Sequence, residues 1–183
     1  MRCIIDHAQP DGVILDDPID TEGMYVHWRC GLDEQGHARV LPSAMALEPS
    51  PNLWFVEVLE RDAEPRAVNL VAFATDDFAP GTVISDAQFF SLPIKSDQQA
   101  GAVRWWCDGG VIDQVFVAPA WRRRGIGSLI LFSADAYQQL NGWSGAIHSD
   151  GRRTSMGDAL VGAMQFPDRI ADLTEVSPPM DPQ

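Results

Sequence analysis

The alternation of apolar and polar residues predicts a chain built mainly of strands. Runs rich in β-branched and aromatic residues are separated by short polar or glycine-containing connectors, and they cover 24–30, 53–59, 67–75, 83–92, 103–107 and 111–117. A polar connector at 60–66 and the turn Asp108-Gly109-Gly110 each join two neighbouring runs. Both connectors predict antiparallel hairpins.

One long helix is predicted by a different pattern, in which apolar residues recur every three or four positions. It begins after Arg122 and ends at Asn141-Gly142, a typical left-handed stop, and its apolar positions are Ile126, Leu129, Ile130, Ala134, Tyr137 and Leu140. A second helix is predicted over 154–166 and a short strand over 170–176.

The run at 143–148 predicts another strand directly after the long helix. A strand, a helix and a further strand in this order form a parallel pair with a right-handed crossover. The loop after Val117 and the end of the second strand near His148 then emerge at the same edge of the sheet. Ligands of open sheets bind at that edge.

The chain of 183 residues, 45% of them hydrophobic, is long enough for one domain with a substantial core. We expect a single domain over 1–176, with a divergent first half, and a flexible tail over 177–183. The start is too short and too acidic for a signal peptide, and no stretch of 18 apolar residues occurs. These features predict a cytoplasmic protein without a membrane partner. The three cysteines are far apart, so no metal site is expected.

The net charge of -13 argues against a nucleic-acid partner, whose phosphates require a basic surface. Residues 1–100 hold 17 acids and 6 bases, whereas five arginines and only two acids lie between Trp121 and Arg153. Surplus surface acid also serves solubility, but the acidic first half favours a cationic partner. The basic segment calls for an anion.

The anion site is predicted where the strand 111–117 turns into the long helix. The sequence there is Arg122-Arg123-Arg124-Gly125-Ile126-Gly127. The first amides of a helix lack intrahelical acceptors, glycines allow close approach to phosphate oxygens, and arginines add charge-assisted hydrogen bonds. A Rossmann fingerprint fails because Ile130 stands at its third glycine, and a Walker loop fails because Gly-Lys-Ser/Thr is absent.

This stretch resembles the acyl-CoA signature of the GNAT superfamily of N-acetyltransferases, an Arg or Gln followed by x-x-Gly-x-Gly or Ala after a strand that ends in Val-x-Val. The resemblance implies an α/β (α+β) fold with a mixed, mostly antiparallel sheet and two splayed parallel strands that admit acetyl-CoA. It implies transfer of the acetyl group to a primary amine. By this resemblance the cofactor-binding residues are Val115, Phe116 and Val117 on the strand, and Arg122, Arg123, Arg124, Gly125, Ile126, Gly127 and Ser128 at the helix start.

The catalytic residues are less clearly indicated. An amine acceptor must lose a proton, and His148 at the ligand edge or Asp113 within the strand are candidates for relaying it. The resemblance implies carbonyl polarisation by a backbone amide near Val117. Family members often carry a tyrosine acid on the helix after the second splayed strand, whereas this chain has only Tyr25 and Tyr137. A non-catalytic acyl-CoA-binding or protein-interaction module is therefore the alternative.

Two further expectations concern the edges and the aromatic residues. The closing hairpin of the family is incomplete here, which leaves an edge for a possible homodimer. Two interpretations are open for four tryptophans, an acceptor wall or ordinary core packing: Trp28, Trp54, Trp105 and Trp106.

Overall fold

The computed structural model describes residues 2–6, 9–15, 25–43, 51–162 and 169–178. The strands in the first half are β1 (Arg2–Asp6), β2 (Gln9–Leu15), β3 (Tyr25–Leu32), β4 (Ala38–Pro42), β5 (Trp54–Glu60), β6 (Ala67–Phe73) and β7 (Thr82–Ser85). Those in the second half are β8 (Gln99–Trp106), β9 (Ile112–Val117), β10 (Arg152–Arg153) and β11 (Glu175–Val176). The helices are α1 (Asp86–Phe89), α2 (Ile126–Leu140) and α3 (Ser155–Val161), with short 3-10 turns η1 (Ser96–Gln98) and η2 (Pro119–Trp121).

Nine of these strands form one sheet in the order β2-β1-β3-β4-β7-β5-β6-β8-β9. Its neighbouring strands are antiparallel except β5 and β7, which are parallel. β10 and β11 form a separate parallel pair. The predicted mixed, mostly antiparallel sheet of an α+β protein is confirmed.

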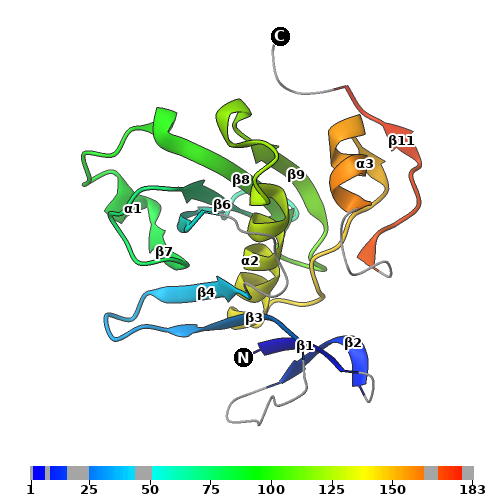
Figure 1. Cartoon of the computed structure of the whole chain (residues 1–183), viewed down its shortest axis with the longest axis horizontal. Helices are drawn as coiled ribbons and strands as arrows, with labels where there is room; N and C mark the ends of the chain where they lie inside the picture. The colour runs from blue at the N-terminus through cyan, green and yellow to red at the C-terminus, as the bar shows by residue number, and fades with distance from the viewer. Residues whose placement is uncertain (1, 7–8, 16–24, 44–50, 163–168, 179–183) are drawn as a thin grey trace.

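The sheet curls around α2, which lies between strands from opposite ends of the order (Figure 1). α2 contacts β3 and β4 from the first half of the chain, and also β8 and β9 from the second half. The apolar positions predicted on the long helix lie within this enclosure except Leu140, which is only partly buried, and the core includes Trp28, Phe55, Leu70, Trp105, Ile126 and Ile130. The helix thus has apolar neighbours over most of its circumference.

The opposite face of the sheet carries a smaller core beside α1. It consists of Trp54, Val56, Phe73 and Ile84, and Trp54 stacks on Phe73 with ring centroids 4.9 Å apart. The alternation of strand side chains divides β5 and β6 between the two cores. A strand buried on both faces has few polar positions, as the sequence of β6 shows.

Both predicted hairpins are confirmed, because β5 pairs with β6 and β8 pairs with β9. The strand expected over 83–92 is wrong beyond Ser85. There the Ser85 side chain accepts from the Gln88 amide and the Gln88 side chain accepts from the Ser85 amide, so the chain enters α1. This reciprocal capping stabilises a helix start over continued strand.

The last part of the chain is shorter in regular structure than its sequence predicts. α3 begins after Thr154, whose hydroxyl accepts from the Gly157 amide at 3.0 Å, and it ends at Val161. Residues 163–166 of the predicted helix and 179–183 of the predicted tail lie outside the described residues. Within 170–176 only an isolated bridge at Ile170 and the two residues of β11 pair as strand.

Candidate functional site

β9 and the segment that follows α2 run side by side for a short distance and then separate. Val111 and His148 form a parallel bridge, and the Ile112 amide donates to the His148 carbonyl oxygen at 2.9 Å. The next residue, Ser149, pairs with Ile170 instead. The two strands therefore diverge after Ile112 and His148, and we call this divergence the fork.

Of the parallel strand predicted over 143–148, only one isolated parallel bridge between Val111 and His148 forms, and a regular strand there is wrong. Gly145 has a left-handed φ of 75° and lies very close to Gly109. A β-carbon on Gly145 would lie 2.3 Å from the Gly109 carbonyl oxygen. The Gln138 side chain also donates to the Ser144 carbonyl oxygen at 2.7 Å, which turns that group away from β9. Pairing starts only after this glycine.

Beyond the fork, β9 has an open edge. The sheet order ends at β9 within the described residues. The Ala118 amide donates to Ala100 on the β8 side at 3.0 Å, so the alternation of a strand directs the backbone polar groups of Val115 and Val117 away from β8. Those of Phe116, which stands opposite Ala102, face β8. Of the three predicted residues, two therefore present backbone groups to a ligand.

A β-bulge at Asp113 lies between the fork and the open edge. Arg104 stands opposite Gln114 and Trp105 stands opposite Ile112, which leaves Asp113 as the extra residue. A bulge bends the strand and increases its twist. The bend coincides with the point where β9 parts from its neighbour.

The Asp113 carboxylate points to the sheet face away from α2, where it joins an ion-pair network. It accepts from Arg104 Nη1 at 2.6 Å, and Arg104 also binds Glu60, with Nη2 to Oε2 at 2.9 Å. The Arg104 guanidinium lies over the Trp106 ring at 4.3 Å. Hydrogen bonds from Arg104 and Asn69 lower the pKa of Glu60 to about 2. Asp113 thus has a cationic partner on the outer face.

The start of α2 has the form of an anion site. Gly125 is its N-cap with a left-handed φ of 71°, and no side chain caps the helix within the described residues. The first helical bond runs from the Leu129 amide to the Gly125 carbonyl oxygen at 3.0 Å. The amides of Ile126, Gly127 and Ser128 precede it and have no intrahelical acceptor. The first turn contains no acidic residue that would compete with an anion.

The three arginines before this helix differ in their surroundings. Arg122 Nε donates to the Val117 carbonyl oxygen at 3.1 Å, which ties the loop to the open edge. Arg123 is exposed and has a left-handed φ of 62°. Arg124 is exposed and lies over the Trp121 ring at 5.1 Å. Neither Arg123 nor Arg124 pairs with a carboxylate in the described part of the chain.

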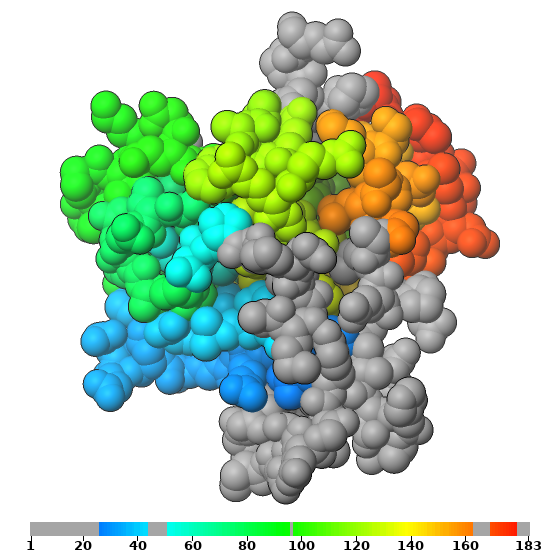
Figure 2. Space-filling model, viewed as in Figure 1, coloured from blue at the N-terminus to red at the C-terminus, as the bar shows by residue number. Residues whose placement is uncertain are grey.

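The residues that follow Gly125 also serve packing. Ile126 is buried in the core inside the sheet. A β-carbon on Gly127 would lie 3.0 Å from Leu160 Cδ1, so this glycine allows α3 to approach the start of α2. Figure 2 shows the surface of the loop before α2 directly beside α3. Helix packing therefore gives a reason for Gly127 that is independent of the candidate anion site.

His148 lies at the fork and is partly buried. Its Nδ1 is 3.0 Å from the Ala146 carbonyl oxygen. A carbonyl oxygen only accepts, so Nδ1 carries the proton in the neutral ring and Nε2 has the lone pair. This arrangement suits a proton acceptor.

A largely apolar cavity occupies the fork on the side of α2. It is lined from α2 by Leu131, Phe132 and Asp135, from α3 by Val161, and from the strands and the C-terminal segment by Ile112, Ile147, His148, Ser149, Arg169 and Ile170. A second, more open hollow adjoins it and shares His148, Ser149, Arg169 and Ile170. The cavity thus begins where β9 and its neighbour part.

The sequence did not predict the polar side of this cavity, which we call its polar floor and which is formed by Asp135 and Arg169. Asp135 is buried, forms an ion pair with Arg169 Nη1 at 2.8 Å, and accepts from Trp28 Nε1 at 2.8 Å and from the Ile147 amide at 3.2 Å. An acid on an otherwise apolar helix face was the available signal for a buried polar site. Nothing in the sequence signalled Arg169 as its partner.

Three of the four tryptophans are core residues, whereas Trp106 is only partly buried and lies under the Arg104 guanidinium, so the four do not form one acceptor wall. Trp28, Trp54 and Trp105 are buried, and Trp54 lies in the core on the opposite face from the other two. Tyr137 is buried as well, and burial followed by the nearby Glu57 raises its pKa far above the usual value. A phenol held so firmly protonated, away from the fork, is a poor proton donor for a thiolate.

Within the described residues, no group of three or more potential metal ligands occurs, and no helix combines the length and apolar character needed to cross a bilayer. No protein-family model, curated protein or solved structure matches this chain.

Proposed function

We propose that the protein is an acyl-CoA-dependent N-acyltransferase of the GNAT type. The observation that carries this proposal is the continuity between the uncapped start of α2 and the open edge of β9, which meet at the Arg122 to Val117 hydrogen bond. A pyrophosphate fits helix amides and exposed arginines, and an amide-bearing arm can pair along a strand edge. Acyl-CoA contains both groups, one after the other.

In this proposal each part of the site has one task. The amides of Ile126, Gly127 and Ser128, with Arg123 and Arg124, hold the pyrophosphate. The Val117 amide and the Val115 carbonyl oxygen pair with the pantetheine arm, because the Val117 carbonyl oxygen already accepts from Arg122. The acyl end then points along β9 toward the fork.

The reaction is direct attack on the thioester. The neutral amine forms a bond to the carbonyl carbon, the carbon–sulfur bond breaks, and the thiolate leaves and is protonated, which gives an amide and free CoA. A backbone N–H on the open edge stabilises the developing oxyanion. Val117 lies five residues from Ile112, roughly 16 Å along an extended strand. Val115 is nearer to the fork, so we assign the oxyanion contact to its amide.

His148 is the proposed base, acting through water from the fork. Asp113 is the weaker candidate, because its carboxylate is bound to Arg104 on the far face of the sheet. We propose a cationic amine as acceptor, because most of the surplus acid lies in the first half of the chain.

The test is release of free thiol from acetyl-CoA in the presence of a panel of amines, together with calorimetric binding of acetyl-CoA. His148→Ala is expected to lower turnover at least about a hundredfold while acetyl-CoA still binds. His37→Ala is the matched control, since His37 lies in the turn between β3 and β4, far from the fork along the sheet. Equal turnover in all three proteins would remove His148 from the mechanism, and absence of acetyl-CoA binding would overturn the proposal.

A non-catalytic acyl-CoA-binding module is the second candidate. It is favoured by the ion pair that engages Asp113 and by the absence of tyrosine from α3. Tight acetyl-CoA binding without thiol release on any amine would support this candidate.

A further inference from the structure

The cavity at the fork has the size and lining of a small apolar binding site. Its volume is about 50 Å³. A water molecule needs about 10–15 Å³ on this measure, so the cavity has room for roughly three to five non-hydrogen atoms. Voids of this size are few in protein interiors, because the atoms that line them lose packing contacts.

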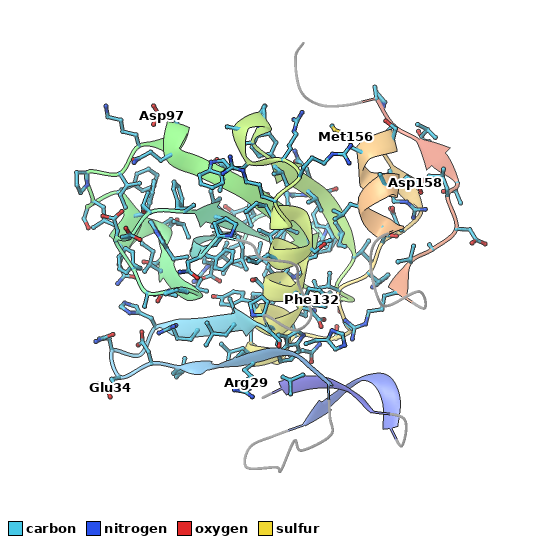
Figure 3. All side chains as sticks on the ribbon, in the orientation of Figure 1. Arg29, Glu34, Asp97, Phe132, Met156 and Asp158 are labelled. Atoms are coloured by element: carbon cyan, nitrogen blue, oxygen red, sulfur yellow. The ribbon has the colours of Figure 1, made fainter. Side chains whose placement is uncertain are left out.

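The lining is apolar on most sides. Leu131, Phe132 and Ile147 are each at least 95% buried, and Val161 closes the cavity from α3. Phe132 comes from the middle of α2 (Figure 3). The polar floor is a balanced ion pair between Asp135 and Arg169. Apolar surroundings without a surplus charge favour a hydrocarbon ligand over a charged one.

The cavity continues the line of the open edge. Ile112, the first residue of β9, donates its amide to the His148 carbonyl oxygen, and both residues line the cavity. A ligand laid along Val117 and Val115 from the start of α2 would reach the fork with its far end. A group carried at that end enters the cavity between α2 and α3.

We propose that the preferred donor carries a short apolar acyl chain longer than acetyl, of the size of butyryl, and that the fork cavity holds this chain. This inference rests on the proposed acyl-CoA function and specifies its donor. The methyl group of acetyl fills only one of the roughly three to five atom positions, whereas the three carbons beyond the carbonyl of a butyryl group fill most of them.

The test is a binding series measured by calorimetry on the full chain with CoA, acetyl-CoA, propionyl-CoA, butyryl-CoA and octanoyl-CoA. Burial of each added methylene is expected to tighten binding about fourfold, so butyryl-CoA binds roughly fifteenfold more tightly than acetyl-CoA. Octanoyl-CoA exceeds the cavity, and its last carbons extend into the adjoining open hollow, where they stay hydrated and gain little further affinity.

Two substitutions at one position test the location. Val161 is only partly buried, so changes there are compatible with folding, which a thermal melt checks. Val161→Phe fills the cavity and is expected to abolish the preference for butyryl-CoA without weakening CoA. Val161→Ala enlarges it and is expected to move the optimum to a longer chain.

The outcomes separate this inference from the proposed function. If CoA binds but acetyl-CoA and butyryl-CoA bind equally well, the acyl cavity is wrong and the acyltransferase proposal stands. A butyryl preference that survives in Val161→Phe also overturns the inference, because the chain then lies elsewhere. If neither CoA nor any acyl-CoA binds, the proposed function fails and the inference fails with it.

Discussion

The two ends of α2 differ in their hydrogen bonds. Side chains near its C-terminal end, the tied end, bond to neighbouring groups, whereas the first backbone amides at its N-terminal end, the open end, have no side-chain acceptor among the described residues. The Gln138 side chain accepts from Trp105 Nε1 at 2.8 Å and donates to the Cys107 and Ser144 carbonyl oxygens at 3.0 and 2.7 Å. The Asn141 side chain donates to the Tyr137 carbonyl oxygen at 2.9 Å.

The N-terminal end has Gly125 as its cap and no side-chain acceptor among the described residues. A helix end without such partners normally meets water or a ligand. The two ends of this helix therefore differ in their surroundings: one end is held by side-chain hydrogen bonds, and the other is the proposed anion site.

The largest effect is expected at the tied end. Gln138→Met keeps the volume of the side chain but leaves the buried Trp105 indole N–H, the buried Cys107 carbonyl group and the partly buried Ser144 carbonyl group without their partner. We expect the free energy of unfolding in urea to fall by about 3 kcal/mol. Gln139→Met is the matched control, because the exposed Gln139 makes one hydrogen bond, to the Gly145 carbonyl oxygen, and should cost less than about 1 kcal/mol. Equal losses in the two variants would contradict the comparison.

An intermediate effect is expected from two glycines with the same backbone conformation. Gly125 at the open end has φ 71° and Gly142 beyond the tied end has φ 66°. Alanine at either position adopts an unfavourable left-handed conformation, which costs about 1 kcal/mol in unfolding free energy. Only Gly125→Ala is expected to weaken acetyl-CoA binding, by tenfold or more, because Gly125 caps the proposed anion site. Gly142 lies beyond the other end of α2, and a β-carbon there would contact nothing within 4 Å. A loss of binding in Gly142→Ala would show that the effect is general strain.

The smallest effect is expected in the ion-pair network on the outer face of the sheet, which involves neither end of α2. The pKa of Glu60 is about 2 in the folded protein and 4.5 without its partners. Because the folded pKa is the lower one, its stabilising contribution is present above pH 4.5 and is lost as the pH falls toward 2. The side chain is 37% exposed, so solvent screening limits this contribution to about 1 kcal/mol or less.

Urea unfolding of Glu60→Gln at pH 6 and pH 2.5 measures this term. The variant is expected to be less stable than the natural chain at pH 6 and nearly equal to it at pH 2.5. A difference that does not change with pH would assign the effect to packing.

The sequence predicted those parts of the structure whose causes are local. The helix 126–140, its stop at Asn141-Gly142 and the hairpins β5–β6 and β8–β9 follow from spacing and turn residues. The candidate anion site is also local, because a glycine and the first amides of a helix occupy adjacent positions. These features need no information from distant residues.

The remaining features depend on contacts between distant segments. The cavity at the fork combines α2 with Val161 and Ile170, and no periodicity reports such a meeting. The bulge at Asp113 becomes visible only in the register with β8. The packing of β3 and β4 against α2 could not be predicted from the sequence either. The short strands of the first half carry no signal for their order in the sheet.

The hydrogen bond between Trp28 and Asp135 also bears on how fast the chain can fold. It joins positions 107 residues apart, and it fixes α2 against a strand from the first half. Chains dominated by such non-local pairings fold in milliseconds to seconds, whereas helical bundles with local contacts fold in microseconds to milliseconds. The start of α2 is specified by a handful of neighbouring residues, yet the position of the helix in the fold depends on a contact between residues 107 positions apart.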